Sequence, residues 1–194
     1  MPEKRIAIVL VLLLLKPFIA VGADEPEDAV WEALKSGRHV VLIRHAITEP
    51  GIGDPPGFRV DDCSTQRNLS AEGRRDATRI GEAFRNRAIP VSEVLSSRWC
   101  RCIDTARLAF GTVTPVSMLD SMFNDKERPA EEKRREVFER VERRPATGNL
   151  VLVTHNRNIL ALTGISPVSG EIVVVTPDGP GRFRLIGRIA SLVN

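Results

Sequence analysis

Short runs rich in Val and Ile alternate with helical patterns along this chain, and that alternation limits its fold more than any other feature does. The runs are bounded by Gly, Pro or polar residues and lie at 40–43, 91–95, 150–153 and 172–175. Continuous apolar runs of this length are typical of strands that are buried on both faces. The pattern therefore predicts a three-layer α/β/α sandwich with a largely parallel central sheet, to which a last strand at 182–190 adds an antiparallel edge.

The segments between these runs carry helix signals. Ser70 is a capping residue, and the apolar residues after it recur at helical spacing until Pro90. Further helices are expected at 103–110, after Pro129, and between His155 and Gly164. The charges at 131–144 alternate in sign, which favours a solvated helix over a binding site for an acidic partner. No repeat or linker interrupts residues 24–194, so we expect one domain there.

The first 23 residues have the pattern of a secretory signal peptide. Lys4 and Arg5 precede a ten-residue apolar run, and small residues end at Ala23. The alternative is an uncleaved anchor, but the run is shorter than the roughly 20 residues that a bilayer span needs. We therefore expect cleavage after Ala23 and a periplasmic or secreted protein.

The charge balance argues against a nucleic-acid partner. The chain has 28 Lys plus Arg and 25 Asp plus Glu; three of the basic and one of the acidic residues lie in the first 23, which leaves 25 against 24. A near-neutral domain lacks the basic field that binds long nucleic acids.

Export would place the three cysteines in an oxidising compartment, where a disulfide persists. Cys100 and Cys102 are too close in sequence to pair comfortably, so we expect Cys63 to pair with one of them and to leave one buried free thiol. A single C-x-C without a second pair lacks the four ligands of a zinc site. No metal is expected.

Two histidines stand at equivalent places, directly after two of the predicted strands. Arg44 and His45 follow the run at 40–43, and His155 follows the run at 150–153. Because the carboxyl ends of parallel strands meet at one edge of the sheet, these side chains are expected to gather there.

A third segment contributes positive charge at the same edge. Arg98 and Arg101 follow the run at 91–95 and open the next predicted helix, whose N-terminus favours an anion. Guanidinium groups match phosphate oxygens and keep their charge. Arg44, Arg101, His45 and His155 therefore predict a phosphate pocket, and the chain has no Walker A or dinucleotide-binding glycine motif that would point elsewhere.

Four segments in this order resemble the histidine phosphatase superfamily, whose fold is phosphoglycerate mutase-like. They are LIRHA at 42–46, RNLSAEGRRDA at 67–77, SSRWCRCIDTA at 96–106 and VTHNRNI at 153–159. The DPPGF, DCSTQRNLS and SGEIVVV stretches are similar to the small exported bacterial branch that includes the lipopolysaccharide core heptose phosphatase.

The resemblance implies a phosphomonoesterase with a covalent intermediate. His45 would attack phosphorus and become phosphohistidine, Arg44, Arg101 and His155 would hold the phosphoryl oxygens, and water would release phosphate. It implies no metal or other cofactor, and a small phosphorylated substrate such as a phosphosugar or a lipopolysaccharide-type ester. Membrane contact would come only through the signal peptide or a lipid-linked substrate, and the oligomeric state stays open.

The chain departs from the family pattern just after the nucleophile. Many members carry Asn or a second Arg there, but this chain has Thr48, Glu49 and Gly51. We take Arg67 as the substitute phosphate ligand. The Gly- and Pro-rich loop at 51–58 is expected to cover the leaving group.

The chain also departs at the general acid of the phytase-like branch, where Asn156 stands in place of Asp and cannot donate the proton. The candidates are Asp120 and Asp125, after a strand expected to end near Leu119, and Glu171.

Asn156 also keeps a second function open. The protein could be a non-catalytic periplasmic phosphate- or phosphosugar-binding protein with a degenerate active site. Both functions predict an anion in the pocket, but only the phosphatase predicts a phosphoenzyme.

Overall fold

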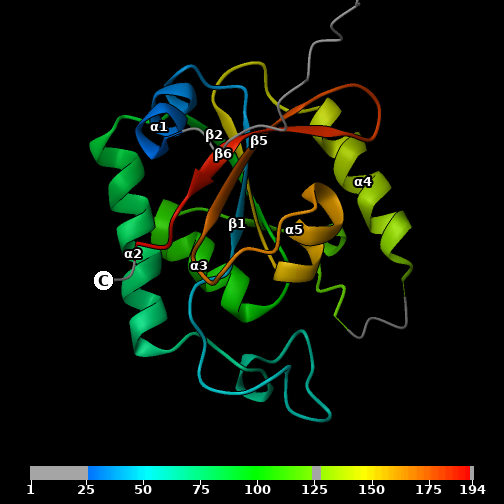
Figure 1. Cartoon of the computed structure of the whole chain (residues 1–194). Helices are drawn as coiled ribbons and strands as arrows, with labels where there is room; N and C mark the ends of the chain where they lie inside the picture. The colour runs from blue at the N-terminus through cyan, green and yellow to red at the C-terminus, as the bar shows by residue number, and fades with distance from the viewer. Residues whose placement is uncertain (1–25, 124–127, 193–194) are drawn as a thin grey trace, which may run out of the picture.

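The computed structural model describes residues 26–123 and 128–192 as a central sheet with helices on both faces (Figure 1). The sheet has six strands in the order β3-β2-β4-β1-β5-β6. The strands are β1 (Val40–Arg44), β2 (Val91–Ser96), β3 (Thr114–Pro115), β4 (Asn149–Thr154), β5 (Ile172–Pro177) and β6 (Phe183–Ile189). The helices are α1 (Glu27–Lys35), α2 (Ala71–Asn86), α3 (Cys100–Phe110), α4 (Ala130–Glu142) and α5 (Asn156–Thr163), with short 3-10 turns η1 (Cys63–Thr65) and η2 (Ser117–Leu119). The predicted α/β sandwich is confirmed.

Strand direction reverses twice across the sheet, on either side of β5. β3, β2, β4 and β1 pair in parallel, whereas β5 runs antiparallel to β1 and β6 runs antiparallel to β5. The antiparallel edge is thus present, and the strand that runs against the others is β5. β1 and β4 lie side by side in the centre, and Arg44 is level with Thr154, so both carboxyl ends reach one edge together.

Alternate residues of the buried strands supply two separate cores. Val41 and Ile43 of β1 pack with α1, α2 and α3, while Val40 and Leu42 pack with α4 and α5. The two groups of helices cover opposite faces of the sheet, as Figure 1 shows. This is why the β1 sequence is apolar without alternation.

Helix α2 also fixes the chain that follows the nucleophile candidate. A Cβ on Gly73 would lie 1.8 Å from the carbonyl oxygen of Ile47, so only glycine permits this approach. Ser70 accepts a hydrogen bond from the Gly73 amide and caps α2, as its sequence predicted.

Three elements differ from the sequence expectations. Helix α1 was not predicted; it buries Val30, Trp31 and Leu34, and its contacts are chiefly with β6. The strand expected to end near Leu119 is wrong, because β3 has two residues and Leu119 closes the turn η2. Lys133 of the charged helix α4 is 2% exposed rather than solvated.

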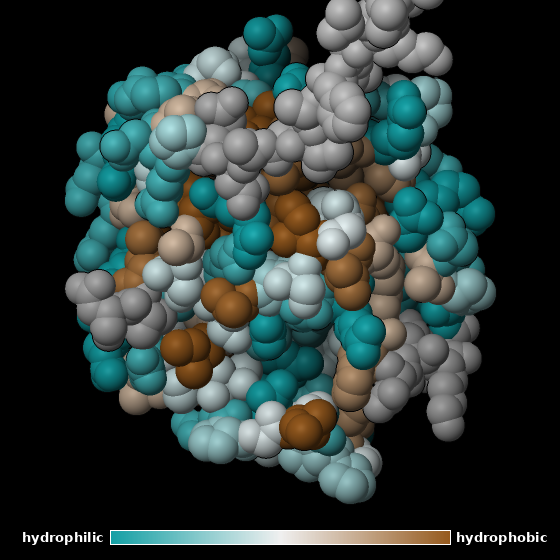
Figure 2. Space-filling model, viewed as in Figure 1, coloured by the Kyte–Doolittle hydropathy of each residue, from teal (hydrophilic) through white to brown (hydrophobic). Residues whose placement is uncertain are grey.

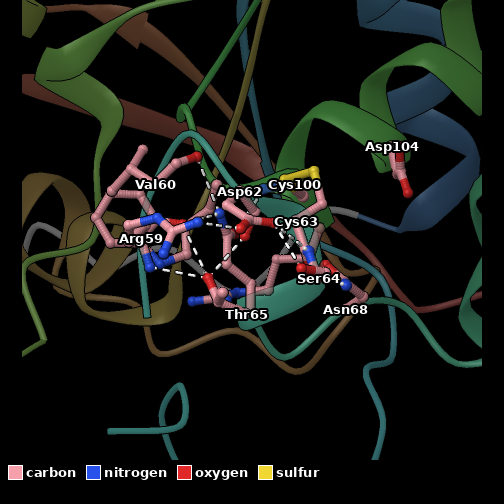
Figure 3. Close-up of a disulfide and its surroundings, with 12 residues drawn as sticks. Arg59, Val60, Asp62, Cys63, Ser64, Thr65, Asn68, Cys100 and Asp104 are labelled. Carbon is pink, nitrogen blue, oxygen red and sulfur yellow. Dashed lines mark hydrogen bonds and ion pairs between the residues drawn. A yellow bond between two sulfur atoms is a disulfide. The ribbon is translucent and has the colours of Figure 1, made fainter. Parts of the chain in front are cut away.

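One of the two disulfide alternatives is present. Cys63 pairs with Cys100, and Cys102 is a buried free thiol whose pKa burial raises to about 12. Figure 3 shows the bond joining the turn at 62–65 to the first residue of α3. A thiol this basic stays protonated and does not exchange with the neighbouring disulfide.

The predicted signal peptide lies outside the described residues. Within 26–123 and 128–192, no helix is both long and apolar enough to cross a bilayer.

Candidate active site

His45 follows β1 directly and is 4% exposed. Its backbone amide donates to the Thr154 carbonyl at 2.9 Å, and its Nδ1 lies 2.9 Å from the carbonyl oxygen of Ala46. A carbonyl only accepts, so Nδ1 carries the hydrogen and Nε2 keeps its lone pair. Burial, followed by the charge of Arg101, lowers the pKa of His45 to about 3. The imidazole is therefore neutral at physiological pH and can act as a nucleophile through Nε2.

His155 is the second histidine at this edge, and it is the N-cap of α5 after β4. The two imidazole centroids are 5.4 Å apart. The Nε2 atom of His155 lies 2.9 Å from the Ser97 hydroxyl oxygen and 3.5 Å from the Cys102 sulfur. Burial, the neighbouring His45 and the charge of Arg101 hold the pKa of His155 well below its usual value. A bound dianion would act in the opposite direction on this pKa and favour a charged imidazole beside it.

Three guanidinium groups surround the histidines. Arg44 donates from Nη1 to the Pro167 carbonyl at 2.9 Å, and Arg67 donates from Nη1 to the Thr48 hydroxyl at 2.6 Å and to the Gly51 carbonyl at 2.9 Å. Arg101, near the start of α3, is 4% exposed. Thr48 and Gly51, which stand where many family members carry a phosphate ligand, thus both accept hydrogen bonds from Arg67 and position it at the site.

These three arginines share an unusual feature. The Nε atom of each is buried and has no acceptor among the described residues. Burial, followed by the like charges of its neighbours, lowers the pKa of Arg44 and of Arg67. A buried N–H donor without an acceptor is unfavourable, and clustered like charges repel. An anion with several oxygens would relieve both costs, so the arrangement suits a phosphate group.

All of these groups open onto one cavity of about 1020 Å³. Its wall has further cationic and apolar members: Arg98, Arg128, Lys133 and Arg157, and Ile52, Phe58, Val60, Trp99 and Phe123. Figure 2 shows hydrophilic side chains lining a hollow in the lower half of this face, with isolated hydrophobic ones around it. The cavity is large enough for a phosphate and the group that carries it.

Two aromatic rings continue from His155 along the cavity wall. Trp99 lies 5.6 Å from His155 and 5.7 Å from Phe58, measured between ring centroids. The Phe58 loop was expected to cover the site, and Gly51, Ile52, Gly53, Asp54 and Phe58 do line the cavity.

The general-acid candidates occupy different places. Asp120 lines the cavity, but its Oδ2 accepts two hydrogen bonds from the Arg98 side chain, and Oδ1 accepts from the Arg98 amide. Glu171 is not part of the cavity wall; its oxygens accept from Arg188 and from the Val168 amide. Asp125 lies outside the described residues.

Asn156 lines the cavity and donates from Nδ2 to the Ser166 hydroxyl and the Pro167 carbonyl. It therefore braces the same carbonyl that holds Arg44. Sequence reasoning missed Asp54, which pairs with Arg101, and Ser97, which contacts His155. The only sequence signal for Asp54 was its place in the covering loop.

No cluster of three or more His, Cys, Asp or Glu side chains suited to a metal ion occurs among residues 26–123 and 128–192.

Solved structures share this fold at low sequence identity. The alpha-ribazole phosphatase from Shigella flexneri is 17% identical with a TM-score of 0.56, over 79% of this chain and 96% of that one. A phosphoserine phosphatase mutant from Entamoeba histolytica, in complex with phosphoserine, is 14% identical with a TM-score of 0.59, over 79% and 98%. The protein histidine phosphatase SixA complexed with tungstate is 12% identical with a TM-score of 0.56, over 79% and 97%.

No curated protein gives a significant match to the sequence. Residues 40–128 do match the family described as Histidine phosphatase superfamily (branch 1). That segment runs from β1 past η2 and includes Arg44, His45, Arg67 and Arg101. The match and the shared phosphoglycerate mutase-like fold confirm the resemblance of this chain to the histidine phosphatase superfamily.

Proposed function

We propose that this protein is a phosphomonoesterase that works through a phosphohistidine on His45. The observation that carries the proposal is the neutral His45 imidazole, with Nε2 free to attack, beside three buried guanidinium Nε–H groups that lack an acceptor among the described residues. The family match and the phosphatases with the same fold support it.

In the first step, the Nε2 lone pair of His45 attacks phosphorus while the bond from phosphorus to the ester oxygen breaks; that oxygen leaves with the bonding electrons and takes a proton from solvent. Arg44, Arg67, Arg101 and a protonated His155 would balance the charge on the three equatorial oxygens. In the second step, water attacks the phosphohistidine, the N–P bond breaks, and His45 returns to its neutral form with release of phosphate. No metal is required in either step.

We further propose that the protein is exported and acts on a small ester such as a phosphosugar or a lipopolysaccharide-type phosphate. The N-terminal pattern supports export, and the Cys63–Cys100 disulfide suits an oxidising compartment. Mass spectrometry of the protein from a Gram-negative host should find a mature chain that begins at Asp24. An intact N-terminus in the membrane fraction would contradict cleavage.

The decisive experiment compares the wild-type protein with His45→Ala on a panel of phosphate esters that includes p-nitrophenyl phosphate and sugar phosphates. We expect the wild-type protein to release phosphate, to form an acid-labile and base-stable phosphoenzyme on rapid quenching, and to keep its rate in the presence of a chelator. The His45→Ala variant should lose both signals while its circular dichroism is unchanged. An oxyanion-binding wild type without turnover would support the alternative, a binding protein.

A further inference from the structure

The carboxylate of Asp54 lies on the cavity wall and accepts hydrogen bonds from Arg67, Trp99 and Arg101. Its side chain is 6% exposed although it belongs to the loop at 51–58, which has no helix or strand. Oδ1 accepts from Arg101 Nη1 at 2.7 Å and from the Arg67 amide at 3.0 Å. Oδ2 accepts from Arg101 Nη2 at 3.2 Å and from Trp99 Nε1 at 2.9 Å. One side chain thus ties the loop to the start of α3 and to Arg67.

The pairing with Asp54 determines which edge of the Arg101 guanidinium group is left for a bound anion. Both terminal nitrogens of the guanidinium group meet Asp54 as a fork, while the buried Nε has no acceptor among the described residues. A bidentate pair fixes the plane of the guanidinium group as well as its distance. Arg101 is also the nearby charge with the largest effect on the pKa of His45. Its orientation therefore matters directly to the nucleophile.

Asp54 also offsets repulsion within the cationic cluster. The charge of Arg101 lowers the pKa of both Arg44 and Arg67, next to the larger effect of burial. A carboxylate paired with Arg101 offsets part of this repulsion and lets three guanidinium groups stay together before an anion arrives. Burial alone would raise the pKa of Asp54, but the hydrogen bond and charge of Arg101 outweigh it and lower that pKa. The group is ionised at neutral pH, so it is not a proton donor to the leaving group.

We propose that Asp54 is a positioning residue, which holds Arg101 with its Nε–H toward the phosphoryl group beside His45 and thereby couples the covering loop to oxyanion binding. This inference rests on the proposed function for the identity of the bound anion. It differs from a purely structural role, because it assigns the effect of Asp54 to Arg101 rather than to the stability of the fold.

The test is the affinity for tungstate, a phosphate-like oxyanion, measured by calorimetry on Asp54→Asn. Asparagine keeps the shape and one acceptor oxygen, but its NH₂ group confronts the donors on Arg101 and Trp99. We expect the dissociation constant for tungstate to rise about tenfold or more, on the scale of one lost charged hydrogen bond. Turnover of p-nitrophenyl phosphate should fall by about ten- to a hundredfold. The matched control is Asp62→Asn, which removes a turn carboxylate bonded to Ser64 and Arg59 in the same segment and should leave affinity and turnover unchanged.

A double-mutant cycle separates positioning from loop stability. Arg101→Lys removes the planar fork, so in that background Asp54→Asn should change tungstate affinity by less than about threefold. Equal effects of Asp54→Asn in both backgrounds, or unchanged affinity in the single variant, would overturn the inference. Tungstate binding needs no turnover, so this test is independent of the proposed function. A wild-type protein that binds tungstate but hydrolyses no ester would contradict phosphatase activity, and the affinities of the variants would still decide the role of Asp54.

Discussion

His45 and His155 follow adjacent strands in the centre of the sheet, whereas Asp54 and Arg67 lie on a long segment between β1 and α2 that has little regular structure. The half of the site that contains His45 and His155 is held by backbone hydrogen bonds that continue the sheet pairing past the strands. The amides of His45 and Ser97 donate to the carbonyls of Thr154 and Val153. The apolar residues of the central strands beneath it are buried.

The half that contains Asp54 and Arg67 is held by individual side-chain contacts. The Cys63–Cys100 disulfide, the Asp54–Arg101 ion pair and the Gln66 side chain, which bonds the Arg59 and Val60 carbonyls and the Cys100 amide, attach the loop to α3. The turn and its disulfide are visible in Figure 3. The sheet therefore places the reactive groups, while the covering wall is placed by individual contacts that can be removed one at a time.

The largest effect is expected in the half held by the sheet. His155→Ala should lower kcat/KM by about a thousandfold, because the variant loses a cation that stabilises the transferring phosphoryl group. Steady-state kinetics on p-nitrophenyl phosphate measure it. His39→Ala, at the opposite end of β1, is the control and should match the wild type; a loss below about tenfold in His155→Ala would contradict the assigned role.

The disulfide carries the next largest effect, on stability. The Cys63→Ser/Cys100→Ser double variant should unfold with a free energy about 2 to 4 kcal/mol lower, since the bond closes a long loop. Denaturant unfolding measures the change. Dithiothreitol should lower the midpoint of the wild type and leave the double variant unchanged, and an equal shift in both would show that the reductant acts elsewhere.

Asp76 of α2, which lies outside the covering loop, should make the stability of the fold depend on pH. It is fully buried, neither oxygen has a hydrogen-bond partner among the described residues, and burial raises its pKa to about 6. The folded state therefore holds a proton that the unfolded state releases, so this group makes the protein less stable as pH rises from about 4 to 6, and the penalty persists above that range. Asp76→Asn should be more stable than the wild type at pH 7 by about 3 kcal/mol.

Unfolding curves at pH 4 and pH 7 test this sign. The stability advantage of Asp76→Asn should be small at pH 4 and largest at pH 7. Asp61→Asn, whose side chain is 89% exposed, is the control and should follow the wild type at both pH values. An advantage that is independent of pH would contradict a raised pKa.

The smallest effect is expected for Arg67→Ala. Its kcat/KM should fall about tenfold, mainly through a higher KM, because Arg67 lies on a loop and two other guanidinium groups remain at the site. Arg44→Ala, the strand-held counterpart, should lose more activity in the same assay. A larger loss of activity in Arg67→Ala than in Arg44→Ala would contradict the view that the sheet places the more important groups.

The sequence was a good guide wherever one strand or helix decided the outcome. The buried runs, the cap at Ser70 and the two histidines at strand ends follow from local patterns, and the structure contains all of them. The short β3 and the turn η2 were harder to predict, since two paired residues leave no periodicity to detect. Helix α1 was missed for another reason: Val30, Trp31 and Leu34 do lie at helical spacing, but a helix of 9 residues repeats that pattern too few times to stand out.

Local patterns were enough to predict a sheet buried on both faces and the gathering of Arg44, His45, Arg101 and His155 at one of its edges, because apolar periodicity and strand ends are local properties. Tertiary structure alone decided which cysteine pairs with Cys63, that Asp54 rather than a solvent molecule meets the Arg101 fork, and that Glu171 is bonded to Arg188 outside the cavity wall. These contacts join residues 17 to 47 positions apart, and no local pattern records them. Long-range pairing depends on where the finished fold brings two segments together, so it appears only once the chain is packed.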